Sequence, residues 1–138
     1  FGSNRISLCI FRNLLNYSIE KKINKALKSQ KAGTKLEGEV AQALGNRVTD
    51  FQKKIVTSEG LLGEIDVETA DYIIEVTSGR SSKTASEFGK YFGTQMNPDG
   101  KGVILFAPNL NETKVESIEE AGVVIIRSIK ELLEYLGR

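Results

Sequence analysis

Histidine and tryptophan are both absent from the 138 residues of the chain, and cysteine occurs once. Without histidine, the chain cannot build a Ser-His or Cys-His catalytic pair, a ribonuclease centre with paired histidines, or a nuclease with a histidine base. A single cysteine forms no internal disulfide, and there is no Cys/His cluster for structural zinc. Any acid–base or metal chemistry must therefore be carried by carboxylates and lysines.

Long apolar runs are absent as well. No stretch reaches the roughly 18 apolar residues of a membrane-spanning helix, and residues 6–11 are too short and too interrupted for a secretory signal. We therefore predict no membrane span. With 40% hydrophobic and 27% charged residues, the composition is typical of one soluble globular domain. The chain begins with Phe1 rather than Met, which we take to indicate a piece of a larger polypeptide.

Charge is unevenly distributed along the chain, although the formal net charge is only +1. Residues 1–35 carry eight basic side chains against one acid, whereas residues 36–138 carry eleven basic side chains and seventeen acids. This basic first part predicts an arm that faces a polyanion. The candidate nucleic-acid contacts are Lys21, Lys22, Lys25 and Lys28. The alternative is a solvated helix whose outer face is rich in lysine.

The spacing of apolar residues predicts helices first, then a β-hairpin, then alternating helices and strands. Between residues 4 and 29 the spacing fits one long amphipathic helix or two, and Thr34 with Glu37 makes a capping-box pattern for a further helix that ends at Gly45. Later helices are expected over 82–96, 114–121 and 128–136, and strands over 47–57, 61–69, 72–77, 102–107 and 123–126. We predict an α/β fold with a mixed central β-sheet flanked by helices. It forms a single domain, in which residues 1–33 are a basic helical segment and residues 34–138 are the α/β core.

Two carboxylates are predicted to face each other across the hairpin. Asp66 lies nine residues before Glu75, and a tight turn at residues 70–71 makes the two strands antiparallel, which brings these positions roughly opposite. Facing carboxylates repel unless a cation lies between them, and oxygen ligands suit Mg²⁺ or Mn²⁺. We therefore expect Asp66 and Glu75 to bind one divalent ion, with Zn²⁺ as a third candidate. A solvent-facing Glu75 on an edge strand is the alternative.

Further charged side chains are expected near this pair. Strand alternation places Leu62, Glu64, Asp66 and Glu68 on one face of the first hairpin strand. Glu39, on the preceding helix, is expected to point inward at the hairpin, with surface charge as the alternative. Lys83 and Lys90 are seven residues apart on one stripe of the predicted helix over 82–96, so one of them can reach the carboxylates. A lysine there would neutralise charge on a phosphate or position a water.

The sequence Gly-Glu-Ile-Asp-Val at residues 63–67, followed by Ile-Ile-Glu-Val-Thr-Ser-Gly at residues 73–79, resembles the PD-(D/E)xK, or restriction-endonuclease-like, nuclease superfamily. The resemblance covers about residues 34–126. It implies a restriction-endonuclease-like core in which Glu39, Asp66 and Glu75 are the catalytic acids. The family's lysine follows the last acid by two residues, where this chain has Thr77. Some members carry that lysine on the next helix, which makes Lys83 the first candidate and Lys90 the second.

Within the superfamily, the spacing of these acids is similar to that of C-terminal toxin domains of contact-dependent growth inhibition systems. This resemblance implies a metal-dependent endonuclease that hydrolyses phosphodiester bonds in tRNA, with DNA as the alternative substrate. It also implies action in the cytoplasm of a target bacterium, an origin as the C-terminal part of a larger secreted or surface-displayed protein, and a cognate immunity protein as partner. Thr77 keeps a second interpretation open, a non-catalytic binding module with a decayed nuclease fold. A plain structural α/β domain is a third, and it leaves the hairpin carboxylates unexplained.

Overall fold

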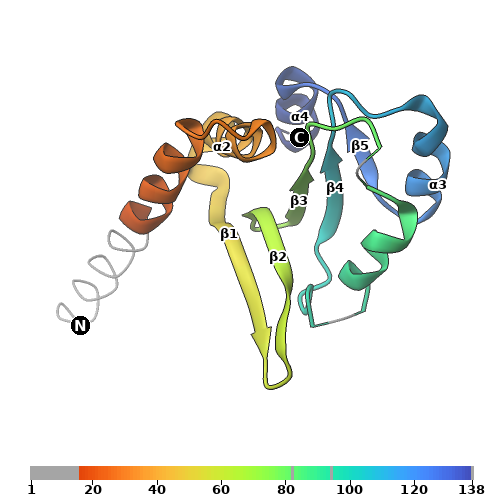
Figure 1. The fold of residues 1–138 in the computed structure, drawn as a ribbon, viewed down its shortest axis with the longest axis horizontal. Helices are drawn as coiled ribbons and strands as arrows, with labels where there is room; N and C mark the ends of the chain where they lie inside the picture. Colours follow the sequence, from red (N-terminus) through yellow and green to blue (C-terminus); the bar gives the residue numbers. More distant parts are fainter. Residues whose placement is uncertain (1–15, 82, 94, 138) are drawn as a thin grey trace.

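The computed structural model describes residues 16–81, 83–93 and 95–137. Their strands form one five-stranded sheet in the order β1-β2-β3-β4-β5 (Figure 1). The strands are β1 (Val48–Thr57), β2 (Gly60–Thr69), β3 (Tyr72–Val76), β4 (Gly102–Phe106) and β5 (Val124–Ile126). The pairs β1–β2 and β2–β3 are antiparallel, whereas the pairs β3–β4 and β4–β5 are parallel. The predicted α/β fold with a mixed sheet is therefore confirmed.

Helices cover both faces of the sheet. One core contains α2 (Ala32–Leu44), α4 (Ile129–Leu136) and buried residues of a helical segment over residues 16–27, and the other contains α3 (Val115–Glu120) and a 3-10 helix (Ala85–Tyr91). Two shorter 3-10 helices span Gly45–Arg47 and Glu112–Lys114. The part of the predicted N-terminal helix before residue 16 lies outside the described residues. Among the described residues, no helix has both the length and the apolar character needed to cross a membrane.

Two of the predicted helix starts are wrong. Helix α2 begins at Ala32, with Lys31 as an N-cap that makes no side-chain bond, so Thr34 and Glu37 form no capping box. The helix predicted over residues 82–96 is the 3-10 helix Ala85–Tyr91, which is capped by Thr84. As a result, the carboxylate of Glu37 is available to other partners. By contrast, the Ser128 cap of α4 is confirmed, because its side chain accepts the backbone N–H of Glu131 at 3.1 Å.

The alternation of side chains changes phase in the middle of β1 and β2. Side chains two apart in a strand normally share a face, yet Val67 packs in the core with α2 and Ile65 packs in the opposite core. Their partners in β1 change face in step: Phe51, opposite Val67, packs with α2, whereas Lys53, opposite Ile65, pairs with Glu68 at 3.5 Å. The predicted common face of β2 is therefore wrong for Glu68. Its carboxylate binds Lys53 and Lys101 instead.

Gln52 lies at this change of phase. It is the one non-glycine residue with a positive φ, 52°, in the part of the chain that the structure describes. The pairing of Phe51 with Val67 and of Lys53 with Ile65 places Gln52 across from Asp66. A non-glycine residue in this left-handed region costs about 1–3 kcal/mol, so the surrounding structure must hold it there. The left-handed backbone of Gln52 therefore lies directly across the β1–β2 ladder from Asp66, the predicted catalytic aspartate.

Candidate active site

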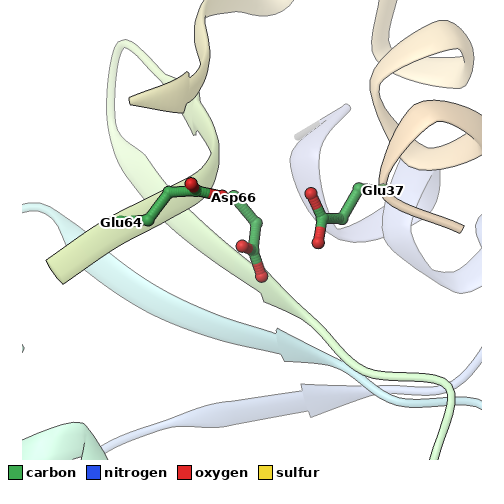
Figure 2. Close-up of side chains that lie close together, drawn as sticks. All are labelled: Glu37, Glu64 and Asp66. Carbon is green, nitrogen blue, oxygen red and sulfur yellow. The ribbon is translucent and has the colours of Figure 1, made fainter. Parts of the chain in front are cut away.

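Three carboxylates from two elements converge beside this irregularity. Glu37 of α2 and Glu64 and Asp66 of β2 each offer an oxygen within 4.8 Å of the others, and we name them the acid cluster. Figure 2 shows Glu37 reaching from its helix towards Asp66. The side-chain amide of Gln52 donates a hydrogen bond to Glu37 Oε1 at 3.1 Å, which holds this carboxylate at the sheet.

Helix rotation decides which acid of α2 joins the cluster. Successive residues turn by about 100°, so Glu37 shares the stripe of Val40, Ala41 and Leu44, all of which are buried against the sheet. Glu39 lies on the opposite side and its side chain is exposed. The inward orientation predicted for Glu39 is therefore wrong, and Glu37 takes that place. The spacing of Glu37 from the three apolar residues was the signal in the sequence.

Asp66 and Glu75 lie across from each other, as the hairpin register predicts. The pairs Val67–Ile74 and Glu68–Ile73 place Asp66 opposite Glu75, and the regular ladder stops there. Instead, the backbone N–H of Asp66 donates to Glu75 Oε2 at 3.3 Å, and the backbone N–H of Val76 donates to Asp66 Oδ2 at 2.9 Å. The two carboxylates thus take the place of backbone acceptors where the strands part. Glu75 itself lies outside the acid cluster, whereas Asp66 belongs to it.

Glu75 is buried rather than solvent-facing, with 2% of its surface exposed. Burial, followed by the neighbouring charge of Asp66, raises the pKa of Glu75 to about 9, and the ammonium group of Lys83 offsets part of this effect. At neutral pH and without a cation, the Glu75 carboxyl group is therefore protonated. Its contact with Asp66 then involves one charge rather than two, which avoids the repulsion expected from the sequence.

Two carboxyl groups of the acid cluster, those of Glu37 and Glu64, also hold protons more tightly than usual. Burial and then the charge of Asp66 raise the pKa of Glu37 to about 7, although the hydrogen bond from Gln52 lowers it. The same two causes, in the same order, raise the pKa of Glu64. A donor set made only of carboxylate oxygens fits hard cations such as Mg²⁺ and Mn²⁺, whereas Zn²⁺ prefers nitrogen and sulfur ligands. Binding such a cation requires Glu37 and Glu64 to lose their protons.

Lys83 and Lys90 both line a cavity of about 420 Å³ that also contains Glu75. Lys83 is half-buried and lies just before the Thr84 cap, not in the first helical turn where it was expected. Its charge lowers the raised pKa values of both Glu37 and Glu75. Lys90 is exposed, with Nζ 5.2 Å from the centre of the Tyr91 ring. Lys83 is the less exposed of the two lysines and the one whose charge acts on both acids, so it is the better candidate.

The described part of the predicted basic segment lies beside the acid cluster. All four of its predicted nucleic-acid contacts, Lys21, Lys22, Lys25 and Lys28, are exposed. The last three line a groove of about 960 Å³ whose lining also includes Glu37 and Glu64. The four together line a neighbouring hollow. Lysines and carboxylates from distant parts of the chain thus share one groove, and nucleic-acid binding there stays a prediction.

Comparisons of the chain with models of known protein families, with curated proteins and with solved structures found no match. The function is therefore inferred from the chain's own residues and from the sequence resemblance described above.

Proposed function

We propose that the chain is a metal-dependent nuclease that hydrolyses phosphodiester bonds. The observation that carries this proposal is the acid cluster, two of whose members, Glu37 and Glu64, line the same groove as Lys22, Lys25 and Lys28. Hydrolysis of a polyanion requires groups that bind the phosphate backbone and groups that hold a cation at the scissile phosphate. Both kinds of group line this groove.

Each residue near the acid cluster has a distinct part in the proposed mechanism. Glu37, Glu64 and Asp66 would hold a divalent ion, which supplies Lewis-acid chemistry and lowers the pKa of a bound water. Glu75 accepts the backbone N–H of Asp66 and so fixes Asp66 at the point where β2 and β3 part. The ammonium group of Lys83 would stabilise the negative charge that develops on the phosphate as water attacks and the P–O bond breaks.

In its finer form, the proposal is a toxin domain that cleaves tRNA in the cytoplasm of a target bacterium. The domain would be the C-terminal part of a larger secreted or surface-displayed protein, and a cognate immunity protein would bind and silence it. The support for these points is the sequence resemblance at residues 63–67 and 73–79. Asp66 lies on β2, Glu75 on β3, Glu37 on α2 and Lys83 in the segment after β3. Glu37 replaces Glu39 in this comparison.

The test is incubation of the purified chain with total RNA and with plasmid DNA, each with Mg²⁺, Mn²⁺, Zn²⁺ or EDTA. We expect cleavage of RNA, foremost tRNA, with Mg²⁺ or Mn²⁺ and none with EDTA. Asp66→Asn should abolish it, while Asp99→Asn, a change at an exposed aspartate outside the groove, should leave it intact. Cleavage of DNA alone would show that the substrate is DNA rather than tRNA. A folded chain inactive on both substrates with every ion would instead be a binding module.

A further inference from the structure

The helical segment over residues 16–27 forms one wall of the groove beside the acid cluster. Strand β1, which also lines the groove and forms its other wall, carries a basic residue as well. Lys54 of β1 is exposed and lines the groove together with Lys22, Lys25 and Lys28 of the basic segment. In the β1–β2 ladder Lys54 lies directly opposite Glu64. Lys54 lies outside the basic first part of the chain, so the charge pattern of the sequence gives it no role.

Lysines from two separate elements share the groove with the same carboxylate. Lys54 is the direct neighbour of Glu64 across the β1–β2 ladder, and Lys22, from the helical segment over residues 16–27, lines the same groove as Glu64. The helical segment and β1 therefore each contribute a lysine to a groove that also contains one member of the acid cluster.

We propose that Lys22 and Lys54 clamp the sugar–phosphate backbone of a nucleic-acid strand from opposite walls of this groove, next to the acid cluster. The proposal deepens the nuclease assignment and rests on it for the role of the acids. Lys25 and Lys28 continue the helix wall: from Lys22 to Lys28 the rise is about 9 Å, at about 1.5 Å per residue. That length matches the axial rise of two to three nucleotides, at about 3.4 Å each in one strand.

The lining of the groove indicates recognition of the backbone rather than of the bases. Besides the four lysines and two glutamates, the described residues that line it are Ala26, Ser29, Thr34 and Gln52, and none of them is an aromatic side chain on which a base can stack. Lysines that contact phosphates set position and affinity but carry no sequence information. Binding in the groove is therefore expected to be strongly dependent on salt and only weakly dependent on base sequence.

The experiment measures binding of fluorescent single-stranded RNA and DNA oligonucleotides to the full chain in EDTA, which prevents metal-dependent cleavage, over a series of salt concentrations. The variants are Lys54→Gln, Lys22→Gln and the double variant, and Lys35→Gln is the matched control, since Lys35 is exposed on α2 and does not line the groove. Each groove variant should weaken binding several-fold and reduce the slope of log K against log salt by about 0.7, the value for one phosphate contact on a single strand. The double variant should lose about twice that slope.

Two outcomes overturn the clamp. If Lys54→Gln behaves like Lys35→Gln while Lys22→Gln weakens binding, the strand follows the helix alone. A change of base sequence that alters affinity more than either substitution would show base recognition instead. Failure of the nuclease proposal can be distinguished from failure of the clamp. If the protein cleaves no nucleic acid, but Lys54→Gln still reduces the salt dependence of binding, the clamp stands and the catalytic assignment is wrong. The RNA and DNA arms should lose the same salt slope with Lys54→Gln, because the phosphates are common to both.

Discussion

Replacing Glu75 by glutamine should make the protein more stable at high pH, which is unusual for a change at a buried residue. The carboxyl group of Glu75 is 2% exposed and accepts the backbone N–H of Asp66 at 3.3 Å. Glutamine has nearly the same shape, keeps an oxygen that accepts this bond, and offers an N–H where the protonated acid has an O–H. The variant therefore imitates the protonated state and removes only the ability to ionise.

The sign and size of the effect follow from the raised pKa. The folded state holds the Glu75 proton up to about pH 9, whereas the unfolded chain releases it near the ordinary value of 4.5. The folded state thus binds more protons between these values, so the contribution of Glu75 to stability is complete below pH 4.5 and is lost as pH rises towards 9. One group contributes a slope of about 1.4 kcal/mol per pH unit. From about pH 5.5 to about pH 7.5, wild type should lose at most about 3 kcal/mol more than Glu75→Gln.

The assay is urea unfolding of both proteins in EDTA across this pH range, with the difference in free energy of unfolding plotted against pH. Glu39→Gln is the control, because it removes an exposed carboxylate from α2 and should run parallel to wild type. A constant difference between wild type and Glu75→Gln would refute the reasoning, since it would mean that the Glu75 carboxyl group ionises equally in the folded and unfolded chains.

Substitutions at the candidate lysines and at the strained strand position test two further points. Lys83→Ala should lower the turnover rate about a hundredfold with metal affinity retained, because it removes the charge that we propose stabilises the transition state. Steady-state kinetics and Mn²⁺ titration would check this. The opposite pattern, inactivity of Lys90→Ala with Lys83→Ala active, would assign that role to Lys90. Gln52→Gly should keep the free energy of unfolding within about 1 kcal/mol, because glycine accepts a φ of 52°, whereas Gln52→Val should lower it by about 2 kcal/mol. Equal stability of the glycine and valine variants would show that Gln52 holds no strained conformation in solution.

The parts of the site predicted correctly from the sequence are those fixed by local geometry. A tight turn between two strands determines which residues face each other, so the opposition of Asp66 and Glu75 could be read from their spacing. The Ser128 cap is likewise a short-range feature. Both depend on residues close together in the chain.

The errors concern features that depend on tertiary packing. Glu37 fits equally well as a capping residue and as part of the buried stripe of α2, and the packing of the helix on the sheet decides between them. The left-handed backbone of Gln52 has no signal of its own, because glutamine is not a residue that favours a positive φ. That conformation changes the phase of β1 and β2, which separates Glu68 from Glu64 and Asp66. A chain that follows strict alternation would have no such break.

The central claim, that the acid cluster of α2 and β2 makes this chain a nuclease, is tested most directly by a matched pair of substitutions on one helix. Glu37→Gln and Glu39→Gln each remove one carboxylate from α2, two residues apart, but only Glu37 belongs to the acid cluster. The measurement is the rate of Mg²⁺-dependent cleavage of tRNA at saturating substrate, with both variants shown to be folded. The account predicts that Glu37→Gln loses at least about tenfold in rate, the lower end for perturbing a metal site, while Glu39→Gln cleaves like wild type. Full activity in Glu37→Gln, or loss only in Glu39→Gln, would contradict it.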